Sequence, residues 1–589
     1  MKGFLKTVLA TLVGMLVFTI VAGIVGVVAV AGLVASDESG GTVRDKSILR
    51  INLSGTIEEM RKDNPLSLLQ DDGSADYGLD ELLAAIRKAK TNGKVKGIYI
   101  EGGMPLAAPA TLEEIRQALL SFRESGKFVY AYADTYSQGG YYVCSAADTL
   151  TVNPAGSIDW HGLASEPVFY TGLLEKLGVR VQVFKVGTYK SAVEPYINTQ
   201  MSEANREQVT SYLTSVWERM LGDVAASRGI EATELNALAD SFMLLRPAEE
   251  LVACRLADRT AYVDEVKAML KAQMGLGEGD KLTFVSVQSM AKTDESSSKS
   301  QDEIAVYYAF GQIITTELSY MDSYASYISS DKVVKDLQEL RKDKGVKAVV
   351  LRVNSPGGSA YASEQICHEV ELLRKEKPVV VSMGGYAASG GYYISSNADK
   401  IYAEPTTLTG SIGIFGLIPD VSELLTEKLG VRFDVVKTNA LSDFGSLSRP
   451  LNEEESRLMQ GEIDRGYETF VGRVAAGRRM TKEAVKRIGE GRVWTGEQAV
   501  GIGLVDELGN LEDAVEGAAA LAGLKDYHTA TYPTPIPWYT ALLNEKKEGY
   551  IDSQMRSLAG EYYPVFTLLR TLKTQDRIQA RLPYDPNIY

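Results

Sequence analysis

The length, composition and charge of the chain narrow the classes of protein to which it can belong. It has 589 residues, of which 45% are hydrophobic and 24% charged, which suits a globular protein of two or more domains. The formal net charge of -15 disfavours nucleic acid as a partner, because an acidic chain repels a polyanion. The three cysteines and three histidines are scattered, so the sequence contains neither a disulfide framework nor the ligand spacing of a zinc site.

Residues 1–36 are predicted to form an N-terminal transmembrane anchor. From Thr7 to Ala35 the sequence has no charged residue, and a helix of this length spans the roughly 30 Å hydrocarbon core with some tilt. Two lysines precede this segment and two acidic residues follow it, so the positive-inside rule places the rest of the chain outside the cytoplasm. The alternative is a cleaved signal peptide with Ala29-Val30-Ala31 as its cleavage site, although such peptides have a much shorter apolar region.

The rest of the chain contains an internal repeat. The segment Gln138-Gly139-Gly140-Tyr141-Tyr142 aligns with Ser389-Gly390-Gly391-Tyr392-Tyr393, and Glu175–Arg180 recurs as Glu427–Arg432. A repeat of this length indicates a duplicated domain, and a polar segment of low complexity separates the two copies. We predict a transmembrane anchor (1–36), an N-terminal domain (47–290), a polar linker (291–302), a C-terminal domain (303–527) and a tail without an assigned role (528–589).

Short β-branched runs alternate with helical patterns in each copy. In the second copy, Ala348–Val353 and Pro378–Met383 are predicted strands, and Ala362–Lys375 between them has the apolar spacing of a helix. This alternation favours βαβ units, so we expect an α/β fold with mainly parallel sheets in each domain.

Two glycine-rich turns follow predicted strands of the second copy. In the first, Ser389 can expose its hydroxyl beside backbone N–H groups, as a nucleophile that leads to an oxyanion requires. The alternative is that Ser389 only caps the helix that follows. In the second turn, Gly357 and Gly358 can direct N–H groups at a ligand oxygen, although Pro-Gly also makes an ordinary tight turn.

A general base for Ser389 is predicted in the other copy. No histidine shares a motif with Ser389, but Lys190 follows an apolar strand in a stretch with few charges. Burial would lower the pKa of this lysine and make it a base, whereas most lysines lie at the surface. The repeat favours a catalytic lysine over a surface lysine. In the alignment of the two copies, Ser389 corresponds to Gln138 and Lys190 corresponds to Ser442. Each copy therefore retains one member of a serine–lysine dyad and lacks the other.

These motifs resemble those of the signal peptide peptidase A (protease IV) family in its long, duplicated form. The resemblance covers the chain from the anchor to about residue 525. The matching motifs are Asn354–Gly358, Gly385–Tyr393, Thr409–Gly413, Gly187–Ala192, Arg492–Gly496 and Gly503–Asp506.

The resemblance implies a Clp/crotonase-type fold in each domain and a set of site residues. Ser389 would be the nucleophile, Lys190 the general base, and Ser411 the residue that orients the lysine. The oxyanion would be bound by N–H groups of Gly357 or Gly358 and of Gly390, with no metal or cofactor.

The resemblance also implies a function and a location. We expect a membrane-bound serine endopeptidase that degrades cleaved signal peptides and other short apolar peptides. Its catalytic domains would lie on the periplasmic side of the cell inner membrane, with lipid around the single-pass anchor, and the chain would form a homotetramer. Two alternatives remain: a crotonase-type acyl-CoA enzyme, for which the sequence lacks a pair of carboxylates near the glycine turn, and a non-catalytic membrane scaffold.

Overall fold

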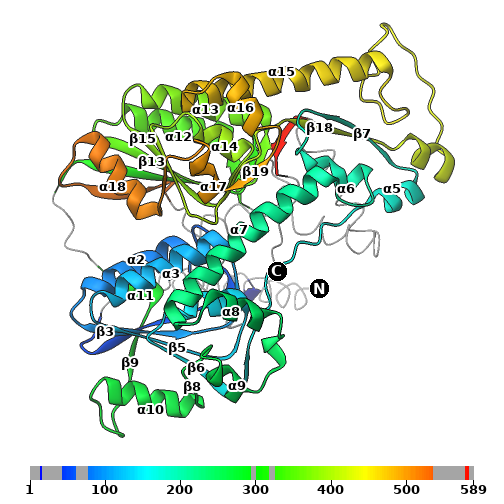
Figure 1. Ribbon diagram of the computed structural model, residues 1–589. Coiled ribbons are helices and arrows are strands. Elements are labelled where there is room, and N and C mark those ends of the chain that lie inside the picture. The colour runs from blue at the N-terminus through cyan, green and yellow to red at the C-terminus, as the bar shows by residue number, and fades with distance from the viewer. Residues whose placement is uncertain are drawn as a thin grey trace, which may run out of the picture.

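The computed structural model describes residues 14–15, 43–61, 77–293, 300–316, 326–534 and 578–582. The predicted transmembrane segment and most of the predicted tail lie outside these ranges. Within the described ranges, no helix has the length and apolarity needed to span a membrane. Two α/β halves lie one above the other, with helix α7 (Glu203–Arg228) running from one to the other (Figure 1).

The first half is built on a parallel six-stranded sheet. Its strand order is β8-β6-β5-β3-β1-β9. Successive side chains on a strand face opposite sides, so Leu49 packs against one layer of helices while Ile48 packs against α10 on the other side. The strands are β1 (Ser47–Asn52), β3 (Val95–Glu101), β5 (Phe128–Tyr136), β6 (Thr149–Ile158), β8 (Arg259–Thr260) and β9 (Thr283–Ser286). The helices are α2 (Leu79–Thr91), α3 (Pro109–Arg123), α4 (Gln138–Cys144), α8 (Ala232–Ala239), α9 (Ala248–Ala253), α10 (Val263–Gln273) and α11 (Val287–Ala291).

The second half repeats this arrangement, which confirms the predicted duplication. Strands β10, β13 and β15 pair in parallel as β1, β3 and β5 do, and α18 covers the face that α10 covers in the first half. The strands are β10 (Glu303–Phe310), β13 (Val346–Ser355), β15 (Val379–Ala388), β16 (Lys400–Ala403), β17 (Leu408–Gly410), β19 (Val493–Thr495), β20 (Glu507–Leu508) and β21 (His528–Tyr532). The helices are α12 (Ser330–Lys342), α13 (Ala360–Arg374), α14 (Gly390–Ser395), α15 (Glu453–Arg478), α16 (Lys482–Ile488), α17 (Gly496–Gly501) and α18 (Leu511–Ala522).

Two described pieces of the predicted tail are strands of the second half. Strand β21 pairs in parallel with β10, as β9 pairs with β1 in the first half. The second piece is β22 (Ile578–Arg581), drawn in red beside β18 in Figure 1. The fold of the second half thus extends past residue 527.

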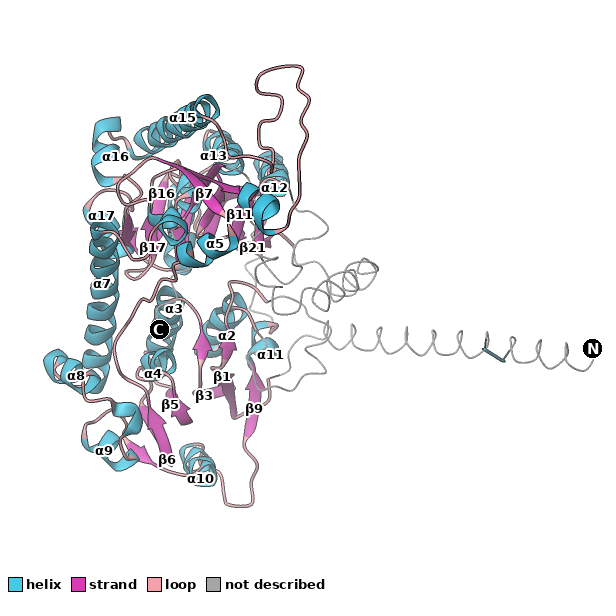
Figure 2. Cartoon of the chain, turned by 90° about the vertical axis from the view of Figure 1, so that its right-hand side faces the viewer, coloured by secondary structure: helices cyan, strands magenta, loops and turns pink. Residues whose placement is uncertain are grey.

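A third sheet joins the two halves. Its order is β12-β11-β14-β22-β18-β7, and β7 (Arg180–Lys185) of the first half pairs antiparallel with β18 (Phe415–Asp420) of the second along all six residues. Figure 2 shows β7 among the strands of the upper half. The remaining strands are β11 (Gln312–Ile314), β12 (Tyr327–Ser329) and β14 (Gly357–Ser359), and a separate pair is formed by β2 (Gly55–Thr56) and β4 (Pro105–Leu106). Two short helices lie on either side of β7 in the sequence: α5 (Thr171–Leu177) precedes it and α6 (Glu194–Ile197) follows it.

A buried ionic network also connects the halves. Arg352 on β13 is 1% exposed, and its guanidinium donates to the carboxylates of Glu59 and Glu114 from the first half at 2.9 and 2.6 Å. Both carboxylates are themselves buried. Removing one partner would leave a buried charge without compensation, so the network fixes how the halves meet.

Candidate active site

Ser389 occupies a strained turn between strand β15 and helix α14. Its backbone has φ 53° and ψ −110°, a conformation that costs on the order of 1–3 kcal/mol and is held only where the surroundings impose it. Here its N–H donates to the carbonyl of Gly410 at 2.8 Å, and its carbonyl accepts from Tyr393 N–H at 2.8 Å. The turn directs the hydroxyl away from the helix cap position, because Ser389 makes no side-chain cap hydrogen bond.

Strand β7 carries Lys190 into the second half. The loop after β7 is fixed by Tyr189 N–H, which donates to the carbonyl of Glu490 at 2.9 Å. Gly491, at φ +80°, lies so close that a Cβ on it would be 2.7 Å from the Lys190 Cα. Residues from the second half therefore hold the lysine backbone of the first.

Gln208 on α7 holds the same loop from the other side. Its amide donates to Tyr189 O at 3.1 Å and to Ser191 Oγ at 2.9 Å, while its Oε1 accepts from Val493 N–H of β19 at 3.2 Å. The side chain is 1% exposed, so these bonds are made away from water, where an unpaired amide would be costly.

Lys190 Nζ meets three oxygen atoms. It lies 2.8 Å from Ser389 Oγ, 3.0 Å from Ser411 Oγ and 3.1 Å from Ser411 O. Lys190, Ser389 and Ser411 are each 0% exposed. A neutral amine has two N–H donors and one lone pair. This set fits a Ser389 hydroxyl that donates to the lone pair and two N–H groups that donate to Ser411.

Burial lowers the pKa of Lys190 well below its usual value. No carboxylate of the described residues forms an ion pair with this amine, so nothing charged opposes the effect of burial. The ring of Phe415 lies 5.9 Å from Nζ and adds to the apolar surroundings. The site thus favours the neutral form, which alone can accept a proton from Ser389.

The two glycine turns meet beside Ser389. A Cβ on Gly357, at φ +99°, would lie 2.8 Å from Gly390 N. The Gly357 N–H itself donates to Ser355 Oγ at 3.1 Å. The N–H of Gly390 begins α14 and has no acceptor within that helix. Of the three glycines predicted as oxyanion donors, Gly357 thus already donates its N–H to Ser355, whereas the Gly390 N–H has no acceptor within its own helix.

The corresponding positions of the repeat have other contacts. The Gln138 amide donates to Gly162 O at 2.8 Å, and its Oε1 accepts from His161 N and Gly162 N at 3.0 and 2.9 Å. Ser442 is exposed and donates to Asn439 O at 2.8 Å. Gln138 has become a structural residue of its half.

Two contributors to the site were not predicted from the sequence. Gln208 carries no signal of its own, because its role depends on α7 crossing to the other half. Gly491 could have been suspected from Gly489-Glu490-Gly491, a glycine pair that follows a helix.

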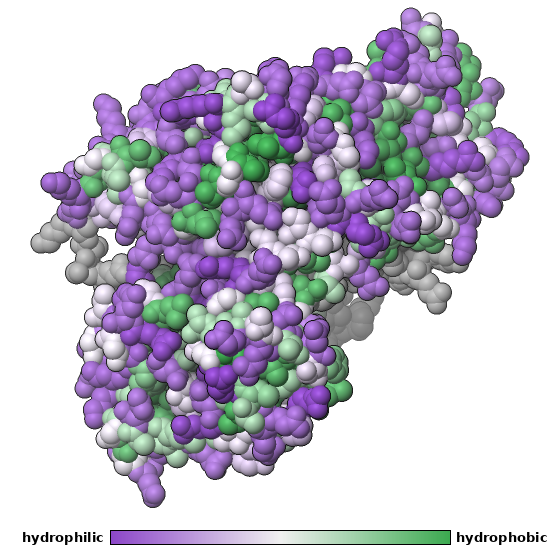
Figure 3. Space-filling model, viewed as in Figure 1, coloured by the Kyte–Doolittle hydropathy of each residue, from purple (hydrophilic) through white to green (hydrophobic). Residues whose placement is uncertain are grey.

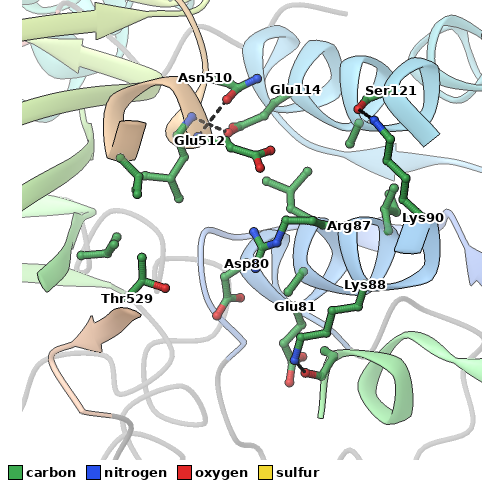
Figure 4. A pocket seen from close by; sticks show the side chains of 18 of the residues that line it. Asp80, Glu81, Arg87, Lys88, Lys90, Glu114, Ser121, Asn510, Glu512 and Thr529 are labelled. Atoms are coloured by element: carbon green, nitrogen blue, oxygen red, sulfur yellow. Dashed lines mark hydrogen bonds between the residues drawn. The ribbon is translucent and has the colours of Figure 1, made fainter. Parts of the chain in front are cut away.

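A large cavity lies between the halves but away from the dyad. Its volume is about 1580 Å³, and Asp80, Arg87 and Glu114 face Asn510 and Glu512 across it (Figure 4). None of its lining residues belongs to the dyad or the glycine turns. Within the described residues, no group of three or more His, Cys, Asp and Glu side chains could hold a metal ion.

Comparison with known proteins gives consistent matches over most of the chain. The model of Peptidase family S49 matches residues 121–277 and 371–525, and the Clp protease model matches residues 301–408. Protease 4 of Salmonella typhi is 38% identical over 503 residues, 83% of this chain and 80% of the relative.

Two further relatives extend the comparison. The chloroplastic serine protease SPPA of Arabidopsis thaliana is 30% identical over 486 residues, 82% of this chain and 70% of the relative. The putative signal peptide peptidase SppA of Enterococcus faecium is 40% identical over 223 residues, 38% of this chain and 64% of the relative. The S49 model matches once in each half, which gives two tandem domains of this family.

Proposed function

Because the chain belongs to peptidase family S49 and is a serine protease, we propose that Ser389 is its nucleophile and Lys190 its general base. The observation that supports these roles is the 2.8 Å contact between Lys190 Nζ and Ser389 Oγ, with both residues fully buried. Nucleophile and base must lie within hydrogen-bond reach, and a lysine base must be desolvated.

Hydrolysis proceeds through an acyl-enzyme. Neutral Lys190 takes the proton of Ser389 Oγ as this oxygen attacks the scissile carbonyl carbon. The N–H groups of Gly358 and Gly390 bind the oxyanion that forms. Protonated Lys190 then gives its proton to the leaving amine, and it later takes a proton from the water that hydrolyses the ester.

Ser411 orients the lysine. Its Oγ and its carbonyl accept the two N–H groups of Lys190, which leaves the lone pair aimed at Ser389. Ser411 itself is held at φ +51° by the bond from its N–H to Arg492 O at 2.7 Å. Ser411→Ala should lower kcat more than KM; an unchanged kcat would contradict this role.

The proposed substrates are cleaved signal peptides and other short apolar peptides. Two observations support this class: the name of the Enterococcus faecium relative, and the apolar N-terminal segment of this chain. Such peptides remain in the membrane, so a membrane-bound protease would meet them.

The same proposal places residues 7–35 across the cell inner membrane, with lipid around them and both protease halves on the periplasmic side. The uncharged sequence and the flanking charges support this topology. In cells, protease added to spheroplasts should digest the domains, and alkaline washing should leave the chain in the membrane fraction. A chain released by washing would contradict the anchor.

We further propose a homotetramer, and the repeat suggests how copies would meet. Residues 432–437 correspond to β7 but form no strand in the described part of the chain. They expose Val435 and Val436, the latter 96% exposed. The counterpart of β18 in the first half, residues 163–168, is likewise not in a strand. Figure 3 shows apolar surface over β7, β18 and the segments beside them, at the upper right of the view.

Pairing of residues 432–437 with residues 163–168 of another copy would repeat the contact of β7 with β18. Such a head-to-tail contact generates a ring when its rotation closes. Light scattering of the detergent-solubilised chain should give four copies, and Val435→Asp with Val436→Asp should give one. Leu521→Asp, on the exposed side of α18, is the matched control and should leave the assembly intact. A wild-type chain that is monomeric would contradict the proposal.

The central experiment compares the two copies of the repeat. Ser389→Ala should abolish hydrolysis of a short apolar peptide, by a factor of more than about 10³, because the nucleophile is lost. Gln138→Ala, at the equivalent position, should retain hydrolysis within a few-fold. Equal losses in both variants would show that the nucleophile is not Ser389.

A further inference from the structure

Arg492 lies between two aromatic rings that come from different halves of the molecule. Its guanidinium carbon is 4.8 Å from the centre of the Tyr189 ring and 4.5 Å from the centre of the Trp494 ring. Tyr189 belongs to the loop after β7 of the first half, whereas Trp494 is on β19 of the second. A planar guanidinium stacks on aromatic faces and is attracted to them at such distances. This stack therefore joins the two halves.

Both rings are attached to segments that carry residues of the proposed site. Tyr189 immediately precedes Lys190 in the chain. Trp494 pairs with Thr409 across β17 and β19, and Thr409 is two residues before Ser411. Lys190 and Ser411 are both fully buried, and a closely packed interior transmits displacements from one residue to the next. The stack thus connects the segment that bears the proposed base with the segment that orients it.

The main chain of Arg492 makes a second link to the site. Its carbonyl accepts the Ser411 N–H at 2.7 Å, and its own N–H donates to Gly489 O at 2.9 Å. Ser411 has φ +51°, a conformation that a serine keeps only where its surroundings impose it. Arg492 therefore contacts Ser411 through its main chain and the loop of Lys190 through its side chain.

Two features align the copies of the repeat in this region. Arg228 pairs with Asp258 at 2.8 Å in the first half, as Arg478 pairs with Asp506 at 2.6 Å in the second. Helices α9 and α17 have six residues each and lie at the same distance in sequence from these aspartates. The alignment between these helices and the aspartates therefore needs no gap.

In this alignment the stack is divided between the copies as the dyad is. The positions of Arg492 and Trp494 hold Leu244 and Arg246 in the first copy. The position of Tyr189 holds a leucine in the second copy, in the same spacing that matches the proposed base with a serine. A contact that served only the fold of each half would be retained in both copies. This contact occurs instead where the dyad is assembled.

We propose that Arg492 is a positioning residue, whose stack between the two rings holds the Lys190 amine against Ser389. This inference rests on the proposed function. Loosening the stack would lengthen the contact between the amine and the serine hydroxyl, and it would admit water to the amine. Since burial is what lowers the pKa of Lys190, water would raise this pKa toward its ordinary value.

The alternative is that Arg492 serves only as the partner of an ion pair. Its guanidinium lies 3.0 Å from the carboxylate of Glu207 on α7, and the Tyr189 hydroxyl donates to the same carboxylate at 3.0 Å. The Glu207 side chain is 54% exposed, and an exposed pair contributes little. A lysine at position 492 could form such a pair, but it has no planar group to stack between two rings. Arg492→Lys therefore separates the two interpretations.

The test measures kcat, KM and the pH dependence of kcat/KM for hydrolysis of an apolar peptide, well below the Tm of every variant. Arg492→Leu introduces the residue of the first copy. Arg492→Leu and Arg492→Lys should both lower kcat by more than about tenfold and leave KM within about twofold. In both variants the rise of kcat/KM should move to higher pH.

A double-mutant cycle tests whether the effect passes through the stack. Tyr189→Leu should lower kcat as Arg492→Leu does, and the variant with both changes should be no worse than the weaker single variant by more than about twofold, because both changes remove the same contact. Losses that simply multiply would overturn the proposal.

Lys400→Met is the matched control. Lys400 Nζ also lies over a ring, 4.8 Å from the centre of Tyr402, and also pairs with a carboxylate, that of Glu507 at 2.8 Å. This cluster belongs to β16 and β20 and not to the segments that carry the site. Lys400→Met should therefore keep the kcat and the pH profile of the wild type.

The possible outcomes separate this inference from the proposed function. An active Arg492→Lys, or a lowered kcat in Arg492→Leu with the rise of kcat/KM still at the wild-type pH, overturns the positioning role and leaves the proposed function standing. A lowered Tm with unchanged kcat would assign Arg492 to stability alone and also overturn it. Hydrolysis by Ser389→Ala at the wild-type rate would instead refute the proposed function itself.

Discussion

The surroundings of Lys190 favour its neutral form, because burial lowers the pKa of the amine and no carboxylate of the described residues forms an ion pair with it. A carboxylate beside an amine stabilises the ammonium form and would prevent it from acting as a base at neutral pH. Here the amine lies among two serines and the Phe415 ring, and burial alone lowers its pKa. Two hydrogen bonds to Ser411 leave the lone pair of the neutral amine for the Ser389 hydroxyl.

This environment predicts a specific pH dependence. The ammonium form is inactive, so kcat/KM should rise with pH through the lowered pKa of Lys190 and level off above it. Lys190→Arg should be as inactive as Lys190→Ala, because a guanidinium stays charged at any usable pH.

The measurement is kcat/KM for hydrolysis of an apolar peptide between pH 5 and about 10, with Lys176→Arg on α5 as the control for a lysine outside the site. Substantial activity in Lys190→Arg would show that only positive charge is needed at this position. A profile without a rise would show that another group is the base.

Some residues of this site could be predicted from the sequence alone and others could not. That Ser389 and Lys190 lie together could be predicted, because each copy of the repeat has one of these two residues and lacks the other. Ser411 came only from the family resemblance, since serine next to glycine is common in turns. Gln208 could not be predicted, because nothing local tells that α7 packs against β19 of the other half. Contacts between residues about 285 positions apart leave no periodic pattern in a single sequence.

At the scale of elements, two connections bring Lys190 to Ser389. The first is β7, which the sequence predicted as a strand but not as a partner of β18 in the other half. The second is the turn after α16, whose Glu490 and Gly491 hold the lysine backbone. An α/β fold with mainly parallel sheets was predictable from alternating patterns, whereas the mixed third sheet was not, because its strands are short and come from distant segments.

The turn after α16 provides a test of this arrangement. In Gly491→Ala the added Cβ would lie 2.7 Å from the N, Cα and Cβ atoms of Lys190, so the lysine loop has to move. We expect kcat to fall more than about tenfold, since a displacement of 1 Å can cost about 10²-fold.

Gly523→Ala is the matched control for backbone strain. Gly523 also has a positive φ, +68°, but a Cβ there has no neighbour within 4 Å. Both substitutions carry a strain of about 1–2 kcal/mol, which lowers Tm, but only Gly491→Ala should lower kcat. Equal activity of the two variants would show that Gly491 does not position Lys190.

At the scale of the molecule, the proposed mechanism requires that the two halves stay docked. The dyad is divided between them, so any opening of the interface separates Lys190 from Ser389. The interface carries α7, the β7–β18 pairing and the Arg352 network. If Ser389 and Lys190 have the proposed roles, the duplication accounts for this division, because each half contains one of the two residues and lacks the other.

The Arg352 network predicts how stability should depend on pH when it is broken. Arg352→Met leaves Glu59 and Glu114 buried without a cation, and removing one partner of such a pair costs about 3–5 kcal/mol. In the wild type, burial already raises the pKa of Glu114, and without Arg352 its pKa should rise further. A carboxyl whose pKa is raised by folding binds its proton more tightly in the folded state. The stability of Arg352→Met should therefore be best at acid pH and should fall as pH rises through the raised pKa. We expect its Tm to lie below that of the wild type by more at pH 8 than at pH 5, with peptide hydrolysis falling in parallel.

The triple variant Arg352→Met, Glu59→Gln, Glu114→Gln should recover part of the lost Tm, because no charge remains to be compensated. Arg374→Met is the control: its pair with Asp399 is partly exposed, so its loss should cost less than about 1 kcal/mol at either pH. A Tm difference for Arg352→Met that does not depend on pH would show that lost packing, and not the unpaired carboxylates, accounts for the destabilisation.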